Sequence, residues 1–477
     1  MLDLLVRGGL VVGAEAVGSW DIGVLDGRIA VLGLPGAAAL EAERVIDASG
    51  LLVVPGGIEP HAHLAHPISM RPESAMFTLG PEEDTVGMAF GGVTTHIDFC
   101  QIHPDTPAEQ AIEQRLSRWR GQSVIDYTFH INFMGSTTPI AAFDQIPELI
   151  QAGFASFKVF TCNVLPPRPT RRPYKLDFGR IGLLMEKVAA NSGIVVVHGE
   201  DDDVVQFNYE RFLQEGRTAG THLHLVHSKL SEQLSFARTI QLARATGAAV
   251  YFVHTSAREG VEAIEQARGA GQPIYGETLH QYLCHTADEY AEPGGYRFHT
   301  YPSVKLQGDQ DALWRGLLDG ALSTVGTDEF PTTQAVKLMG ERIDDVTGGN
   351  LGAEARMGIV YTEGVSKRGM TLRRFVDVTA TNAARILGLY PRKGTIAVGS
   401  DADLALLDTR QPKRLSRADF HVADYSPWEG WEVTAWPVMT ILRGRPIIES
   451  GKLVGRPGDG ELVPRRIEPH VLQRPAC

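Results

Sequence analysis

Val53–Leu64, with the sequence VVPGGIEPHAHL, is an apolar run that ends in two histidines one residue apart. Side chains alternate between the two faces of a β-strand, so residues two positions apart share a face. If the strand persists that far, His61 and His63 point their imidazoles the same way. Two nitrogens that converge on one point suit a metal ion. The pair alone is weak evidence in a chain with 16 histidines, so the remaining ligands have to come from elsewhere in the sequence.

Size and composition narrow the class of protein. A chain of 477 residues predicts one large domain with a smaller one. Hydrophobic content of 43% and charged content of 21% are typical of a soluble globular enzyme. A net charge of −12 argues against nucleic acid or an acidic membrane surface as the main partner, and leaves a small-molecule substrate.

Neither the cysteines nor the N-terminus indicates export. The 4 cysteines are far apart and form no CxxC pair, which argues against a disulfide framework and a cysteine zinc site. The first residues, MLDLLVRGGLVV, lack the pattern of a signal peptide. No run reaches the roughly 18 apolar residues that cross a bilayer. We therefore expect a cytoplasmic protein.

The middle of the chain alternates strand-like and helical patterns. Helical candidates include 107–120, 179–190, 231–245 and 259–268. Eight strands that alternate with helices predict a (β/α)8 TIM barrel, although a doubly wound open sheet has the same alternation. The eight apolar runs lie at 53–58, 93–99, 127–133, 156–160, 194–198, 250–254, 273–277 and 323–328.

Both ends of the chain have a different sequence pattern, in which short strand-like runs are separated by Gly or Asp-Gly turns. The simplest explanation is one small β-sandwich domain built from both termini. We therefore predict a composite β domain from residues 1–54 and 393–460. The barrel would span 55–392, and 461–477 would form a C-terminal tail.

Polar side chains end several of the predicted barrel strands. Active sites of (β/α)8 barrels lie at the C-terminal ends of the strands. A single histidine there is more often a core or rim residue, but six such residues at one edge predict a site. These six are His61, His63, Lys158, His198, His254 and Asp328.

Four imidazoles, a carboxylate and a lysine are too many ligands for one tetrahedral zinc, so they favour a two-metal site. A protonated lysine cannot bind a metal. A neutral amine can add carbon dioxide, and the resulting carbamate has two oxygens that could bridge two ions. Burial of Lys158 against Phe157 and Phe160 would favour the neutral amine. From the residues alone, a salt bridge between Lys158 and Asp328 remains an alternative.

The chain resembles the dihydropyrimidinase/D-hydantoinase branch of the amidohydrolase superfamily over nearly its whole length. The motifs that carry this resemblance are GGIEPHAHL at 56–64, GGVTT at 91–95, SFKVF at 156–160, VHGE at 197–200, VHTS at 253–256, GTDEFP at 326–331 and DYSPWEGWEV at 424–433.

The resemblance implies a binuclear hydrolase and assigns its ligands. One ion would take His61, His63, carbamylated Lys158 and Asp328, and the other would take Lys158, His198 and His254. A metal-bridging hydroxide would attack a cyclic amide, with Asp328 as general base and then acid. The ligand types suit zinc, with manganese or cobalt as alternatives. Members of this branch are usually tetramers, so a homo-oligomer (tetramer or dimer) is expected.

Two positions depart from the pattern of the branch. A tyrosine five residues after the bridging lysine serves there as oxyanion donor, and this chain has Asn163. The serine that meets the imide-like edge of the substrate aligns with Tyr301. Asn163 or Tyr301 could therefore contact the substrate, with Tyr301 as replacement for the missing phenol or as a space-filling residue. The loop after Lys158 is also rich in arginine. Arg168, Arg171 and Arg172 either meet a substrate carboxylate or are solvated.

The sequence therefore predicts a metal-dependent hydrolase that opens a cyclic amide or imide, such as a hydantoin or a dihydropyrimidine. An amidohydrolase acting on a linear amide, a carbamate or a lactam is the alternative within the enzyme class. A non-catalytic scaffold related to dihydropyrimidinase is a third reading, which the six retained ligand candidates disfavour.

Overall fold

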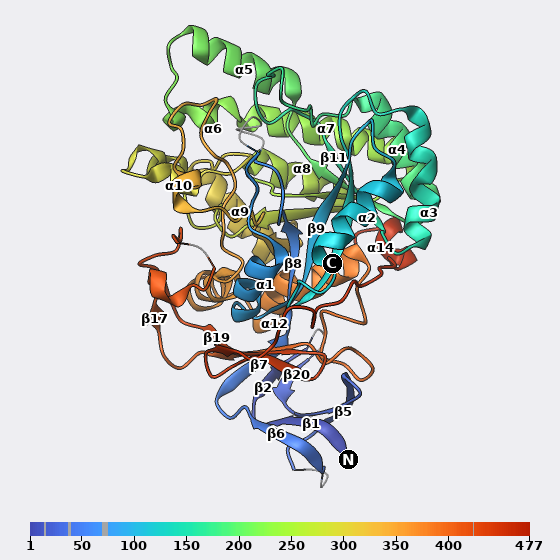
Figure 1. The fold of residues 1–477 in the computed structure, drawn as a ribbon, viewed down its shortest axis with the longest axis vertical. Helices are drawn as coiled ribbons and strands as arrows, with labels where there is room; N and C mark the ends of the chain where they lie inside the picture. The colour runs from blue at the N-terminus through green and yellow to red at the C-terminus, as the bar shows by residue number, and fades with distance from the viewer. Residues whose placement is uncertain (14–15, 37–39, 69–74, 423) are drawn as a thin grey trace.

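The computed structural model describes residues 1–13, 16–36, 40–68, 75–422 and 424–477. Its centre is a parallel sheet of 8 strands in which each strand pairs with the next along the chain (Figure 1). The strands are β8 Gly57–Ala62, β9 Val93–Ile102, β10 Asp126–Phe133, β11 Ser156–Phe160, β12 Ile194–His198, β13 Val250–Phe252, β14 Ile274–Leu279 and β15 Thr324–Gly326.

The sheet closes between its first and last strands. Just beyond β15, the amide of Glu329 donates to the carbonyl of His61, and the amide of His63 donates to the carbonyl of Glu329. These two bonds, 3.0 and 2.7 Å long, join the end of β8 to the end of β15. The closure confirms the predicted (β/α)8 barrel and excludes the open sheet.

The predicted strand Val53–Ile58 is wrong as a single barrel strand, because two strands of different sheets divide it. β7 (Leu51–Pro55) pairs with β16 (Leu404–Asp408) outside the barrel, and only β8 joins the barrel. Gly56 lies between them. A Cβ atom at Gly56 would lie 2.1 Å from Oγ1 of Thr94, so only glycine allows this close approach of the two segments.

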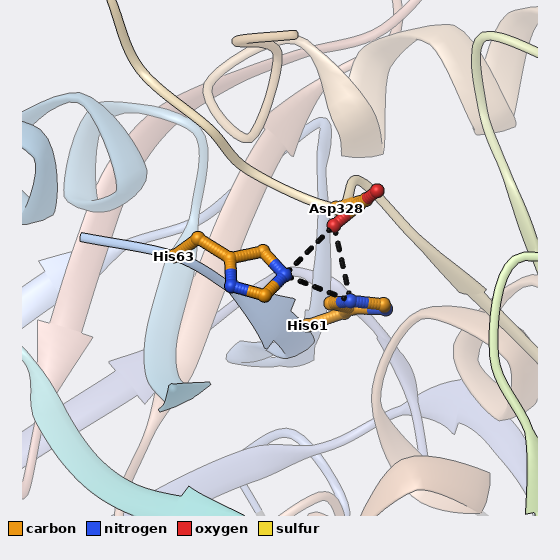
Figure 2. A group of neighbouring side chains, drawn as sticks. All are labelled: His61, His63 and Asp328. Atoms are coloured by element: carbon orange, nitrogen blue, oxygen red, sulfur yellow. Dashed lines mark hydrogen bonds and ion pairs between the residues drawn. The ribbon is translucent and has the colours of Figure 1, made fainter. Parts of the chain in front are cut away.

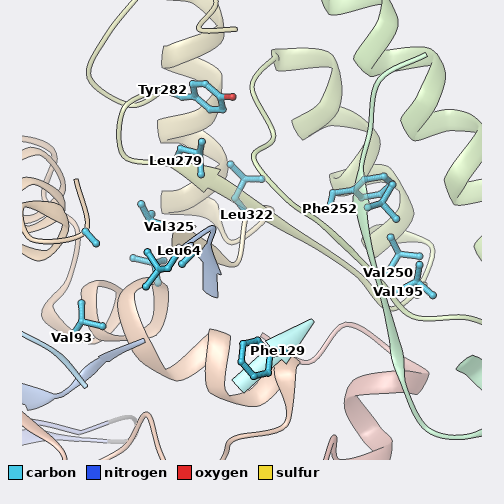
Figure 3. Packing of buried hydrophobic residues seen from close by; sticks show 14 of the residues in the cluster. Leu64, Val93, Phe129, Val195, Val250, Phe252, Leu279, Tyr282, Leu322 and Val325 are labelled. Atoms are coloured by element: carbon cyan, nitrogen blue, oxygen red, sulfur yellow. The ribbon is translucent and has the colours of Figure 1, made fainter. Parts of the chain in front are cut away.

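Amphipathic helices cover the outside of the barrel. Strand residues alternate: on β12, Val195 and Val197 pack in the cluster beneath the helices, whereas Ile194 and Val196 fill the barrel interior. Figure 3 shows part of the outer cluster, including Val195, Phe252 and Leu279. The principal helices are α1 Pro81–Phe90, α2 Ala108–Trp119, α3 Ile146–Gln151, α4 Phe178–Ala190, α5 Asp202–Gln214, α6 Leu223–Val226, α7 Lys229–Thr246, α8 Arg258–Gly269, α9 Gln307–Asp319, α10 Gln334–Lys337, α11 Arg356–Val360, α12 Leu372–Val376 and α13 Asn382–Leu387.

Strands from both ends of the chain form two sheets below the barrel in Figure 1. One sheet has the order β5-β4-β1-β6 and the other β21-β20-β19-β16-β7-β2-β3. Leu4, Ile22, Val53 and Leu404 share one buried cluster between them. The strands are β1 Leu2–Arg7, β2 Leu10–Val12, β3 Val17–Ser19, β4 Asp21–Leu25, β5 Arg28–Gly33, β6 Ala42–Asp47, β19 Trp436–Leu442, β20 Arg445–Glu449 and β21 Lys452–Leu453, and a separate pair is β17 Lys413–Arg414 with β18 Glu432–Val433.

The last residues pack against the barrel. Val463, Ile467 and Val471 are buried with interior strand residues such as Tyr275. The hydroxyl of Tyr275 donates to the carbonyl of Val471 within α14 (Pro469–Gln473) at 2.6 Å. Residues 461–477 therefore close the N-terminal end of the barrel. Among the helices that the structure describes, none is both long and apolar enough to cross a membrane.

Candidate active site

A cavity of about 90 Å³ lies at the C-terminal end of the barrel strands. The structure brings all six predicted ligands to its wall. The cavity is lined by His61, His63, Lys158, His198, His254 and Asp328, together with His66, Pro67, Gln101, Phe160, Val164, Tyr174, Thr300, Tyr301, Phe330, Gly348 and Gly349.

Three of these side chains converge on one point, as Figure 2 shows. The Nε2 atoms of His61 and His63 lie 3.2 Å apart, and Oδ1 of Asp328 lies 3.0 and 3.1 Å from them. Nδ1 of His61 contacts Oε1 of Glu277 at 2.8 Å, which leaves Nε2 for the cavity. The two histidines hold the pKa of Asp328 well below its usual range against the effect of burial, so this carboxylate is ionised.

Lys158 lies in an apolar slot beside these three residues. It is 1% exposed, and its Nζ lies 4.9 Å from the ring centroids of both Phe99 and Phe160. Phe99 thus takes the place that the sequence suggested for Phe157, which faces the outer helices. Burial lowers the pKa of Lys158 to about 7 although Asp328 raises it, and no ion pair of Lys158 is found among the described residues. The salt-bridge alternative therefore loses its support.

His198 and His254 form the other side of the cavity, with ring centroids 4.4 Å apart. Nε2 of His198 contacts Oε2 of Glu200 at 2.9 Å, and Glu200 also contacts Nδ1 of His227. Burial lowers the pKa of both His198 and His254, so their imidazoles are neutral at neutral pH. A neutral imidazole is the form that binds a metal.

Two of the candidate ligands have unusual backbone geometry. His254 has φ of +43° and Asp328 has φ of +51°, in the left-handed region. Each lies two residues beyond the end of a short barrel strand, β13 or β15. Non-glycine residues in this region cost of order 1–3 kcal/mol and are concentrated at functional sites. The strained turns aim both side chains at the cavity.

The donor set fits two divalent cations. His61, His63 and Asp328 offer donor atoms within 4.8 Å of one another, which suits one ion. His198 and His254 offer imidazoles for a second, and Lys158 approaches both groups. Another buried cluster of carboxylates, Asp126, Asp401 and Asp403, already surrounds the ammonium of Lys393 and is not a comparable site.

Comparison with known proteins agrees with this geometry. Residues 52–447 match the profile described as the amidohydrolase family. The chain belongs to that family. It is 34% identical to a D-hydantoinase of Geobacillus stearothermophilus over 469 residues, which cover 97% of this chain and 96% of the relative. A D-hydantoinase of Ralstonia pickettii is 32% identical, with 98% and 99% covered.

Similarity to a solved structure identifies the branch of the amidohydrolase family to which the chain belongs. The dihydropyrimidinase from Brevibacillus agri NCHU1002 superimposes with a TM-score of 0.90 at 31% identity, covering 98% of this chain and 99% of the other. The chain is therefore a member of the hydantoinase and dihydropyrimidinase branch, as its motifs indicated. The shared fold includes the barrel and the β-sandwich.

The two residues at which this amidohydrolase departs from its branch occupy different places. The ring of Tyr301 lines the cavity. Asn163 is not among the lining residues, because its Oδ1 accepts the amides of Tyr174 and Lys175 at 2.9 and 3.2 Å. Tyr174, which the sequence analysis did not single out, lines the cavity instead. Tyr174 lies far from Lys158 along the chain, so no local sequence pattern indicated that it would lie in the cavity wall.

The three arginines of the same loop make different contacts. Arg168 donates to the carbonyl of Asp344, and Arg172 approaches Asp105 on the surface at 3.4 Å. Arg171 donates to the carbonyl of Pro166, and both Arg171 and Arg172 line an adjoining cavity. None of the three lines the cavity of the six candidate ligands. Glu277 was also missed, although it ends the strand run PIYGE as an acidic residue and so carried a signal.

Proposed function

We propose that this protein is a binuclear metal hydrolase that opens a cyclic amide or imide ring of the hydantoin or dihydropyrimidine type. One observation carries the proposal: all six side chains predicted as metal ligands line one cavity at the C-terminal end of the barrel, with a buried lysine among them. The activities for which the relatives are named, D-hydantoinase and dihydropyrimidinase, supply the substrate class.

The ligands divide into two sets around Lys158. His61, His63 and Asp328 would hold one ion, and His198 and His254 the other. The lysine, whose pKa burial lowers to about 7, would be carbamylated in its neutral form and would help to hold both ions. Because Glu200 engages Nε2 of His198, we assign Nδ1 of that ring to the metal. Imidazole and oxygen donors suit zinc, with manganese and cobalt as the other candidates.

When bound, the two metals supply a water acidic enough to attack near neutral pH and polarise the amide carbonyl. The protein supplies the proton transfers. Asp328 is ionised, so it would accept the proton of the attacking water and pass it to the leaving ring nitrogen. Oγ1 of Thr300 donates to Oδ2 of Asp328 at 3.3 Å, and His61 and His63 contact Oδ1, so both oxygens have fixed directions.

The test is a substrate panel on protein loaded with zinc in bicarbonate buffer. Hydantoin, 5-phenylhydantoin, dihydrouracil and succinimide represent rings, and N-carbamoylglycine represents a linear ureide. We expect turnover of at least one ring and two metal ions per chain. Turnover of linear compounds alone would contradict ring opening, and absence of bound metal after growth in metal-replete medium would support a non-catalytic scaffold.

A further inference from the structure

We propose that His227 and Tyr209 are positioning residues for the ion assigned to His198 and His254, and that they act on it through Glu200. This inference rests on the proposed function and deepens it, because it names the residues that decide how tightly that second ion is held. His198, Glu200, His227 and Tyr209 form one chain of hydrogen bonds. Of these four, only His198 is among the residues that line the cavity, so the other three act through its ring.

Every link of this chain lies within hydrogen-bond distance. Nε2 of His198 lies 2.9 Å from Oε2 of Glu200, and Nδ1 of His227 lies 3.0 Å from Oε1 of the same carboxylate. Nε2 of His227 lies 2.9 Å from the hydroxyl of Tyr209 on α5. All four side chains are buried, so bulk water does not compete for these contacts.

The chemistry of the groups gives each hydrogen bond a direction. A carboxylate only accepts, so Glu200 calls for a proton on Nε2 of His198 and on Nδ1 of His227. The neutral ring of His227 then accepts the hydroxyl proton of Tyr209 at Nε2, since the other contact of this hydroxyl, with the carbonyl of Val164, is longer at 3.2 Å. The lone pair of His198 is left on Nδ1, the atom that we assign to the metal.

The partners of the carboxylate are fixed from two different elements. Oγ1 of Thr161, just beyond β11, accepts the amide of Glu200 at 3.0 Å and lies 2.9 Å from the carbonyl of His198. On α5, Nδ2 of Asn208 donates to the carbonyls of the two residues that precede His227, at 3.2 and 3.1 Å. The barrel therefore holds Glu200, and α5 holds His227 against it.

The ring of His198 depends on Glu200 for its tautomer. Its other neighbours are rings: Phe160 stacks at 4.8 Å between centroids, and His254 lies edge-on at 4.4 Å. Such contacts fix the plane of the imidazole but not which nitrogen carries the proton. Among the described residues, Glu200 is the one hydrogen-bonding partner of this ring. If Glu200 loses the donor from His227, its carboxylate can turn, and His198 can take the tautomer that does not bind the metal.

Zinc binding to the metal-free full chain tests the proposal. At the lowest free zinc concentration that loads two ions on the wild type, we expect His227→Ala to retain one ion. Its affinity for the second ion should fall about 10–100-fold, as for loss of an outer partner of a ligating histidine. His227→Asn should restore the second ion, because the amide nitrogen of asparagine lies near the place of Nδ1 and can donate to Glu200. Tyr209→Phe should weaken the second ion about fivefold, as for loss of one hydrogen bond.

A double variant shows whether His227 acts through Glu200. Glu200→Ala should weaken the second ion at least as much as H227A does, and E200A/H227A should match E200A within about twofold, because both changes break one path. The matched control is His96→Ala, which removes a buried histidine of β9 that contacts Trp119 and is not among the cavity-lining residues. H96A should bind both ions as the wild type does.

Zinc counts separate this inference from the proposed function. If the wild type binds two ions and opens no ring, the proposed function fails, while the comparison of H227A with H227N still decides the inference. Wild-type affinity for both ions in H227A, equal loss in H227A and H227N, or fewer than two ions on the wild type would overturn it.

The milder variant Y209F decides the inference if H227A does not fold. Its control is Tyr127→Phe, a buried tyrosine of β10 that is not among the cavity-lining residues. Affinity for the second ion should be lower in Y209F than in Y127F, and equal affinity in the two variants would overturn the proposal.

Discussion

At the scale of single residues, the proposed two-metal site depends on Lys158. Its Nζ is enclosed by Phe99 and Phe160, and burial brings its pKa to about 7, so the neutral amine that reacts with carbon dioxide is accessible. We predict that Lys158→Ala loses at least one of the two metals and lowers activity at least 10³-fold. Metal analysis of the purified variant and ring-opening assays measure the two effects.

The dependence of reactivation on bicarbonate gives a second test of Lys158. Metal-free wild-type protein should regain activity with zinc faster in bicarbonate than in buffer depleted of carbon dioxide, and K158A should show no such dependence. The control is Lys187→Ala, a lysine in the last turn of α4 that pairs with Asp144 and does not line the cavity. Full metal content and activity in K158A would refute the bridging carbamate.

Glu277 supports the same site from behind the ligands. It accepts from Nδ1 of His61 at 2.8 Å, from the hydroxyl of Tyr251 at 2.8 Å and from the amide of His254 at 3.1 Å. A carboxylate that fixes the tautomer of a ligating histidine is worth 10–100-fold in metal affinity. We therefore predict that Glu277→Ala weakens zinc binding by about that factor, as measured by competition with a chelator.

The control for Glu277 is another buried glutamate. Glu232 binds the amides of Ser256 and Ala257 and does not line the cavity. Glu232→Gln should leave zinc affinity within twofold of the wild type. If E277A binds zinc as tightly as E232Q does, Glu277 has only a structural role.

At the scale of elements, Gly56 separates the small β domain from the barrel. A side chain at this position would overlap the side chain of Thr94, with Cβ 2.1 Å from Oγ1. Overpacking of this kind costs roughly 1–3 kcal/mol. We predict that Gly56→Ala lowers the free energy of unfolding by that amount, measured by urea denaturation.

A second glycine offers the comparison for G56A. Gly33, at the end of β5, has no atom within 4 Å of its ideal Cβ position. Gly33→Ala should change stability by less than about 0.5 kcal/mol. Equal stability of the two variants would mean that β7 and β8 separate for a reason other than the contact with Thr94.

The strands and loops also show which features of the fold and the site a sequence can predict. Polar residues that end apolar strand runs, such as His198 and Asp328, are local signals, and the barrel rule then brings them together. The division of Val53–Ile58 depends on the distance from Gly56 to Thr94, which no local pattern encodes. Tyr174 lies in the cavity wall because the loop returns to Asn163, eleven residues earlier, and to Gly135, so its place could be seen only in the folded loop.

At the scale of the whole molecule, one buried lysine connects the barrel to the segments that follow it. Nζ of Lys393 lies 2.6 Å from Asp126 at the start of β10, 3.1 Å from Asp401 and 2.6 Å from Asp403, just before β16. Arg443, after β19, also pairs with Asp126. Burial alone would lower the pKa of Lys393, but the three carboxylates raise it above its usual value, so the ammonium stays charged.

Removal of this ammonium leaves the negative charges of three buried carboxylates with fewer positive charges to balance them. Breaking a buried ion pair from one side costs about 3–5 kcal/mol. We predict that Lys393→Met destabilises the protein by that amount, with a lower thermal midpoint for both the barrel and the β domain, because Lys393 contacts both. The exposed pair of Lys187 with Asp144 gives the control, and Lys187→Met should cost less than about 1 kcal/mol. Equal midpoints for the two variants would show that the joint between the domains does not depend on Lys393.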